Sequence, residues 1–221
     1  MVTYADIAKM IDHSLLRPEF SDRDIEEGCR LAHEYGVAAV SVRPSDVVLA
    51  KRVLENSNVL IDVVIGFPHG TTTMLTKVTE AKEAIKNGAD ELDMVLNIGK
   101  LRSGEYDYVK SDIQAVKDIA TEKNVTLKVI FENCYLSEEQ IVAACEICNE
   151  VGVDFIKTST GYGSGGALDQ DLKIMRKHAN PDIQLKAAGG VRTLERAIEI
   201  RQLGCTRFGC TVTAGILERL K

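Results

Sequence analysis

The stretch Asp-Phe-Ile-Lys-Thr-Ser-Thr-Gly, at residues 154–161, is typical of a buried strand that ends in a polar loop containing glycine. Lys157 follows two residues of core type, Phe155 and Ile156, and a lysine is rarely buried in such surroundings unless it is paired. Burial lowers the pKa of a lysine, and a neutral lysine can attack a carbonyl group to form a Schiff base. The alternative is a lysine at a strand end that extends its ammonium group into water.

A second stretch repeats this pattern, because Ile-Gln-Leu-Lys-Ala-Ala-Gly-Gly at 183–190 also places one lysine, Lys186, in an apolar strand before glycines. Two lysines at matching strand ends would bring two ammonium groups close together, and each would lower the pKa of the other. The more buried of the two would then be the nucleophile. The pair therefore favours a catalytic interpretation of Lys157.

The order helix, glycine, strand recurs along the chain, with the glycines at Gly36, Gly88, Gly152 and Gly204. Glycine just past a helix allows the left-handed backbone that turns the chain into a strand. Apolar runs predict eight strands, at 10–14, 37–42, 60–66, 91–96, 127–132, 154–158, 183–188 and 205–209.

Eight alternating strand–helix units predict an α/β protein with a (β/α)8 TIM barrel, formed by residues 1–221 as a single domain and entered through a short N-terminal helix over 3–9. The alternative is an open, doubly wound sheet. That fold usually has a glycine-rich turn after its first strand, and residues 14–18 do not form one.

Composition limits the classes of partner. The 221 residues are 45% apolar and 27% charged, and the net charge is −6 with both signs mixed along the chain, which argues against nucleic acid and anionic membranes. The N-terminus shows no signal peptide and no stretch of about 18 apolar residues occurs, so we expect a cytoplasmic protein. Its six cysteines are then expected to be free thiols.

The active site of a barrel lies at the carboxyl ends of its strands, and phosphate often binds in the loops after strands seven and eight. Lys157 and Lys186 lie near the ends of the predicted strands six and seven. Asp93 lies inside strand four, where an acid should either pair with a cation or transfer protons, and Asp12 on strand one is a similar case.

Backbone amides are the candidate phosphate ligands, because glycine permits close approach and a helix N-terminus favours an anion. Each cluster alone could be an ordinary turn, but three of them converge on one barrel mouth. The candidates after strands six, seven and eight are Gly161, Gly163, Gly165, Gly166, Gly189, Gly190, Gly209 and Thr211.

Other chemical motifs have simpler explanations. Cys145 and Cys148 lie on the apolar face of a predicted helix, so we interpret them as core thiols rather than a redox or metal pair. The four histidines lack metal-ligand spacing, which disfavours a metal site. Glu132 could orient a lysine or close the barrel rim.

At this point the sequence resembles the deoxyribose-phosphate aldolase family of class I aldolases, over essentially its whole length. The matching segments lie at 11–16, 64–68, 88–95, 155–161 and 186–192. The resemblance implies cleavage of 2-deoxy-D-ribose 5-phosphate to acetaldehyde and D-glyceraldehyde 3-phosphate without metal or organic cofactor. It assigns the Schiff base to Lys157, the tuning of that lysine to Lys186, and proton transfer to Asp93.

Several positions depart from the usual family pattern and concern substrate choice. They are Ser41, Arg43, Asn133 and Val212, of which Arg43 is expected to bring a cation to the cavity mouth. The expected substrate-binding residues are Asp12, Ser41, Arg43, Thr158, Gly161, Gly189, Gly190, Gly209 and Thr211. Two other hypotheses stay open: a Schiff-base aldolase for another phosphorylated sugar, and a non-catalytic barrel that binds a phosphosugar. The candidate assemblies are a homodimer and a homotetramer.

Overall fold

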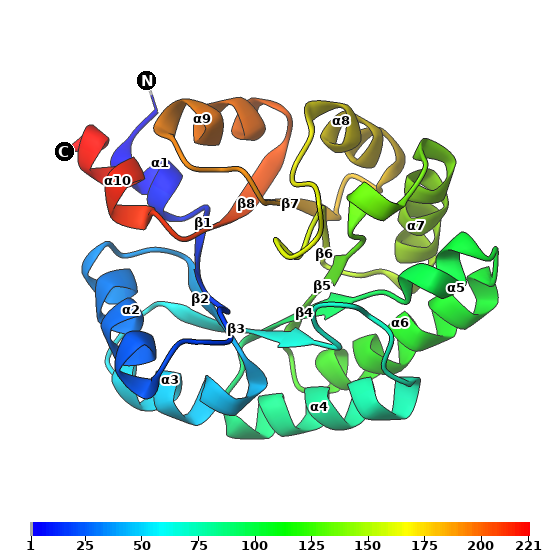
Figure 1. Ribbon diagram of the computed structural model, residues 1–221, viewed down its shortest axis with the longest axis horizontal. Coiled ribbons are helices and arrows are strands. Elements are labelled where there is room, and N and C mark those ends of the chain that lie inside the picture. The colour runs from blue at the N-terminus through cyan, green and yellow to red at the C-terminus, as the bar shows by residue number, and fades with distance from the viewer. Residues whose placement is uncertain (1) are drawn as a thin grey trace.

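The computed structural model describes residues 2–221. Eight parallel strands form a closed barrel in the order of the sequence, and β8 (Cys205–Cys210) pairs with β1 (Ile11–Leu15) to close it. Helices surround the barrel on the outside, as Figure 1 shows in a view down the shortest axis. The predicted (β/α)8 barrel is confirmed, and the open sheet is excluded.

The other strands are β2 (Ala39–Val42), β3 (Leu60–Ile65), β4 (Glu91–Val95), β5 (Thr126–Ile130), β6 (Phe155–Lys157) and β7 (Gln184–Ala188). The helices are α1 (Tyr4–Ala8), α2 (Asp22–Glu34), α3 (Val47–Val53), α4 (Met74–Asn87), α5 (Ile98–Arg102), α6 (Tyr106–Glu122), α7 (Glu138–Val151), α8 (Asp169–His178), α9 (Leu194–Gln202) and α10 (Thr213–Leu217). Short 3-10 turns lie at Pro44–Asp46, Asn133–Tyr135 and Glu218–Leu220.

The predicted N-terminal helix is confirmed as α1. Thr3 caps it by accepting a hydrogen bond from the amide of Asp6, whose carboxylate accepts one from the amide of Thr3 in return. Such a capping box satisfies amides that a helix start leaves without partners. The same device at Ser137 and Gln140 opens α7. Figure 1 shows α1 beside α10, so the two chain ends lie together.

The helices present apolar faces to the barrel. In α6 the stripe Val109, Ile113, Val116 and Ala120 is fully buried. Cys145 and Cys148 are also fully buried within α7, which confirms their interpretation as core residues. Within residues 2–221, no helix is both long and apolar enough to cross a membrane.

Four strands end one or two residues earlier than the sequence pattern suggests, namely β3, β4, β5 and β6. We expected strand five to reach residue 132, but β5 ends at Ile130 because Glu132 adopts a left-handed backbone, with φ of 57°. That conformation turns the chain into the 3-10 turn at Asn133–Tyr135. β6 likewise ends at Lys157, so Thr158 begins the loop rather than completing the strand.

Candidate active site

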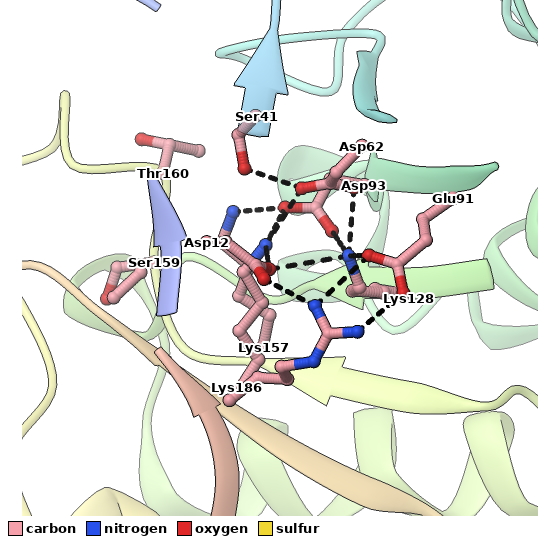
Figure 2. A network of polar contacts seen from close by, with 12 residues as sticks. Asp12, Ser41, Asp62, Glu91, Asp93, Lys128, Lys157, Ser159, Thr160 and Lys186 are labelled. Atoms are coloured by element: carbon pink, nitrogen blue, oxygen red, sulfur yellow. Dashed lines mark hydrogen bonds and ion pairs between the residues drawn. The ribbon is translucent and has the colours of Figure 1, made fainter. Parts of the chain in front are cut away.

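The strand register turns eight charged side chains into the barrel. Successive side chains of a strand point to opposite faces, so in a barrel every second residue points inward. Figure 2 shows the resulting network of ion pairs, which connects residues from seven of the strands. Its members are Asp12, Asp62, Glu91, Asp93, Lys128, Lys157, Lys186 and Arg207, which we call the barrel charge cluster.

Lys157 is a member of this cluster that also lines a cavity. Among residues 2–221, its ammonium group forms an ion pair with Asp93 and with no other carboxylate. Burial lowers the pKa of Lys157 below its ordinary value, and the nearby charge of Lys186 adds to that effect, whereas Asp93 opposes it. The predicted direction of the pKa shift is therefore confirmed.

The pKa of Lys186 differs from what the sequence predicts. Lys157 and Lys186 are register partners on β6 and β7, and both contact the same oxygen of Asp93, so they are neighbours as predicted. Lys186 also pairs with Asp12 at 2.5 Å and with Asp62 at 2.9 Å. Burial disfavours its charge, but Asp12, Asp62 and Asp93 outweigh burial and raise the pKa of Lys186 above its ordinary value.

Two predictions made from the sequence, on the pKa values and on the role of burial, are thus wrong. The pKa values of the two lysines are not both lowered, because only the pKa of Lys157 falls, whereas that of Lys186 rises. Nor does deeper burial identify the lysine whose pKa is lowered. Lys186 is fully buried and Lys157 is 3% exposed, yet Lys186 keeps its charge because it has more carboxylate partners.

Lys128 is a third buried lysine that the sequence reasoning missed. Its ammonium group lies 2.6 Å from Glu91, 2.9 Å from Asp62, 3.4 Å from Asp93 and 3.5 Å from Asp12. Burial is outweighed by these carboxylates, which raise the pKa of Lys128 well above its ordinary value. The same signal that marked Lys157, a lysine within an apolar strand, could have found it.

Arg207 enters the barrel through an irregularity in β8. The pairing of β7 with β8 shifts register between Leu185 and Lys186, so that Arg207 lies opposite Lys186. Bulges of this kind re-aim a side chain. The guanidinium group pairs with Asp12 and, at 2.8 Å, with Glu91. The sequence alone gave no sign that this arginine faces the interior.

Asp93 links the lysines of the cluster. It pairs with Lys157, with Lys186 at 2.7 Å and with Lys128 at 3.4 Å. Burial opposes its ionisation, but Lys128, Lys157 and Lys186 outweigh burial and hold the pKa of Asp93 well below its ordinary value. Asp93 is therefore a carboxylate near neutral pH, paired with cations as the sequence analysis anticipated.

A cavity of about 510 Å³ opens above the cluster, at the carboxyl ends of the strands. The structure brings the three predicted glycine segments together there, since Gly161, Gly189, Gly190, Gly209 and Thr211 all line it. Ser41 and Thr160 line it as well. Gly190 has a φ of 89°, a left-handed conformation that favours glycine. The cavity is thus lined both by these glycine loops and by Lys157.

Arg43 does not reach this cavity, contrary to our expectation. Its guanidinium group pairs with Asp46 at 2.5 Å and donates hydrogen bonds to the backbone oxygens of Arg17, Pro18 and Phe20. Because Arg17 and Pro18 line the cavity, Arg43 supports its wall from behind. The sequence placed the charge near the mouth but could not show that these contacts consume its hydrogen-bond donors.

Thr158 and Asp12 also lie outside the cavity lining. The hydroxyl group of Thr158 donates to the backbone oxygen of Ala188 and accepts from its amide, so it joins β6 to β7. Asp12 is fully buried in the charge cluster, where it pairs with Lys186 and Arg207. Both residues therefore support the structure around the cavity and do not line it.

Contacts made by Glu132 and Tyr162 shape the rim of the cavity. The carboxylate of Glu132 accepts hydrogen bonds from the amide and the hydroxyl group of Thr160, so it fixes the loop after β6 and does not orient a lysine. Tyr162, on the same loop, donates from its hydroxyl group to the backbone oxygen of Leu16 at 2.7 Å. The Tyr162 ring also packs edge-on against Phe67, with 5.4 Å between centroids.

Within residues 2–221, no three side chains of His, Cys, Asp or Glu are arranged to hold a metal ion. The chemical resources of the site are a lysine of lowered pKa, an ionised carboxylate in contact with it, and glycine loops that line the cavity. A neutral amine in such a place can add to a carbonyl group, and amides can bind an anion.

Comparison with known proteins places this chain in a family. Residues 7–212 match the model of the DeoC/LacD family aldolases. A deoxyribose-phosphate aldolase from Clostridium perfringens (strain SM101 / Type A) is 49% identical over 212 residues, which cover 96% of this chain and 94% of the relative. A second relative of that name, from Thermococcus gammatolerans, is 49% identical over 215 residues and 96% of each protein.

The solved structures agree with the sequence comparison. The tetrameric deoxyribose phosphate aldolase from Aeropyrum pernix has a TM-score of 0.92 and 26% identity, and the match covers 99% of this chain and 92% of that one. The chain described here therefore belongs to the DeoC/LacD family of aldolases, which are lyases.

Proposed function

We propose that this aldolase cleaves 2-deoxy-D-ribose 5-phosphate reversibly to D-glyceraldehyde 3-phosphate and acetaldehyde, through a Schiff base on Lys157. One observation carries the proposal. Of the three lysines in the charge cluster, Lys157 lines the cavity and has a lowered pKa, whereas the pKa values of Lys128 and Lys186 are raised. A neutral amine on the cavity floor is what carbonyl addition requires.

The phosphate group would bind at the wall formed by the glycine loops. The amides of Gly161, Gly189, Gly190 and Gly209 and the hydroxyl group of Thr211 are the proposed donors, since these residues line one side of the cavity. A sugar held there by its phosphate would extend its aldehyde end toward Lys157. Ser41, on the floor of the cavity, is then available to a hydroxyl group of the sugar.

The reaction needs one nucleophile and balanced proton transfers. The neutral amine of Lys157 attacks C1 of the open-chain sugar, and the resulting carbinolamine takes up one proton and loses water to give an iminium ion. The C3 hydroxyl group loses its proton, the C2–C3 bond breaks, and its electron pair forms an enamine while D-glyceraldehyde 3-phosphate leaves. A proton added at C2 restores an iminium ion, and its hydrolysis by water then releases acetaldehyde, the free amine and one proton.

Asp93 and Lys186 have supporting roles in this scheme. Asp93 contacts Lys157 directly and stays ionised, so it can accept the proton that the lysine loses and stabilise the iminium ion. In the proposal it moves the C2 proton through a water molecule. Lys186, fixed by three carboxylates, keeps a positive charge beside Lys157 and so favours the neutral form of that amine.

The names of the relatives support this substrate, since proteins 49% identical to the chain are called deoxyribose-phosphate aldolases. A Schiff-base aldolase for a different phosphorylated sugar is the remaining alternative for substrate identity. We further propose a cytoplasmic protein that assembles as a homodimer or homotetramer. A tetrameric relative supports the second part, and the mass of the native assembly would test it.

The direct test is retro-aldol turnover. Purified enzyme is incubated with 2-deoxyribose 5-phosphate, and the aldehyde products are measured by coupled reduction. We expect turnover of this sugar at a kcat/KM well above that of ribose 5-phosphate and of 2-deoxyribose. A higher kcat/KM on another phosphorylated sugar would identify that sugar as the substrate in place of 2-deoxyribose 5-phosphate. No turnover of any sugar phosphate would contradict the proposed reaction.

A further inference from the structure

Asp62, on β3, is a fully buried carboxylate that no step of the proposed reaction uses. It lies between two ammonium groups, with Oδ1 at 2.9 Å from Lys128 and Oδ2 at 2.9 Å from Lys186. Oδ2 also accepts a hydrogen bond of 2.6 Å from the hydroxyl group of Ser41, which lines the cavity. Figure 2 shows Asp62 at the centre of these contacts, so it connects the buried lysines to the cavity floor.

When every member is ionised, the four acids and four bases of the barrel charge cluster carry no net charge. The groups that face one another there come from seven strands, while β2 adds only the neutral Ser41. The acids are Asp12 (β1), Asp62 (β3), Glu91 and Asp93 (β4), and the bases are Lys128 (β5), Lys157 (β6), Lys186 (β7) and Arg207 (β8).

A buried net charge is costly, so a cluster of this kind tends to remain neutral. If one carboxylate were lost, the excess positive charge would be relieved when one of the bases releases a proton. Asp62 therefore helps to determine how many protons the cluster holds, although it does not itself line the cavity.

The pairing identifies the base that would release the proton. Lys128 and Lys186 would each keep two or more carboxylate partners without Asp62, and a guanidinium group such as that of Arg207 does not deprotonate in proteins. Lys157 has Asp93 as its single carboxylate partner within residues 2–221 and is open to the cavity. The proton would therefore leave from Lys157.

We propose that Asp62 is a positioning residue that supplies the balancing negative charge of the cluster and thereby sets the pH above which Lys157 becomes a nucleophile. The inference rests on the proposed function, because it treats Lys157 as the reacting amine. The electrostatic effect of Asp62 on Lys157 has the required sign, since its negative charge raises the pKa of that lysine.

The test is the pH dependence of Lys157 acetylation by trace amounts of acetic anhydride, which reacts with neutral amines. Labelling of Lys157 is quantified by peptide mapping from about pH 5 to about pH 10, a range that brackets a lowered lysine pKa. In Asp62→Asn and Asp62→Ser, we expect the midpoint of labelling to fall by about one pH unit or more, which is roughly a tenfold gain in labelling at acid pH. The acid limb of the pH profile of kcat/KM should shift to lower pH together with the labelling midpoint.

Two controls separate charge from structure. Asp62→Glu keeps the charge, so its midpoint should stay close to that of the wild type. Asp112→Asn removes another fully buried carboxylate, which pairs with Lys77 at 2.5 Å between α4 and α6, outside the barrel. Its Lys157 midpoint should equal that of the wild type even where the variant is less stable.

An unchanged or higher midpoint in both Asp62→Asn and Asp62→Ser would overturn the proposal. An equal downward shift in Asp112→Asn would also overturn it, because the effect would then follow from general destabilisation. The acetylation assay uses no aldehyde or sugar. Its result therefore differs from a failure of the Schiff-base mechanism, which would appear as absent retro-aldol turnover with the midpoint shift intact.

Discussion

Three lysines occupy the same barrel interior, and their carboxylate partners decide which one can react. Lys128 and Lys186 are held by several acids each, whereas Lys157 pairs with Asp93 alone among the described residues. An apolar strand interrupted by a lysine is visible in the sequence at all three positions. The identity of the partners is not visible there, because they come from strands far apart in the chain. The sequence therefore predicted the direction of the pKa shift for Lys157 and gave the wrong direction for Lys186.

His13 is a residue outside the reaction whose titration should be visible in stability. Its Nδ1 lies 2.9 Å from the Thr213 hydroxyl group, and burial lowers the pKa of His13 to about 4. As the pH falls below about 6.5, the unfolded chain binds a proton that the folded protein does not bind until about pH 4. The folded state should lose on the order of 3 kcal/mol across this window, and no more from this group at lower pH.

The measurement is urea unfolding of the wild type and of His13→Gln at several pH values between about 7 and about 4. We expect the difference between their free energies of unfolding to change across this range, since the variant lacks the titrating group. Parallel curves would show that His13 does not titrate as its buried position requires.

At the scale of elements, the sequence predicted the eight strands and the cluster of glycine loops, but not their fine geometry. Glycine after helices and apolar runs are local signals, so the order of elements could be read directly. The left-handed backbone at Glu132 and the irregular pairing that turns Arg207 inward depend on contacts between distant segments. Arg43 shows the same limit, because its partners in the loop before α2 became apparent only in the folded chain.

The loop after β7 gives a prediction about phosphate binding. In Gly190→Val, a branched side chain is placed on a backbone with φ of 89°, so the loop must change conformation and its amides are displaced from the phosphate. We expect KM for 2-deoxyribose 5-phosphate to rise roughly tenfold or more, with a much smaller change for unphosphorylated 2-deoxyribose.

Gly104→Val is the matched control for this variant. Gly104 has a similar φ of 76° and open space around it, but it lies between α5 and α6, away from the cavity lining. The Gly104→Val variant should have similar backbone strain and leave KM unchanged for both 2-deoxyribose 5-phosphate and 2-deoxyribose. Equal losses on both sugars in Gly190→Val would mean that Gly190 supports the loop without binding phosphate.

At the scale of the whole molecule, the barrel is built around charge as well as around apolar side chains. A buried ion cluster is stable only while its charges remain matched, and removing one partner leaves a buried charge without compensation. Lys128 is fully buried and pairs with acids from three strands, so it should be the most sensitive point of this arrangement.

Lys128→Met should therefore lower the free energy of unfolding by about 3 kcal/mol or more, even though methionine fills a similar volume. The control is Lys110→Met, which breaks the exposed pair between Lys110 and Glu150 and should have little effect. Denaturant unfolding of both variants at neutral pH measures the difference. Similar stabilities for the two variants would show that the cluster does not depend on charge matching.

The central claim is that Lys157 is the lysine that forms the Schiff base, and reductive trapping tests it most directly. The enzyme is incubated with acetaldehyde and borohydride near neutral pH, and the modified peptide is mapped by mass spectrometry. We predict one ethyl group per chain, on Lys157, and none in a folded Lys157→Arg variant, because a guanidinium group never presents a neutral amine. A label on Lys186 or Lys128, or no label on any lysine of the cluster, would contradict the account.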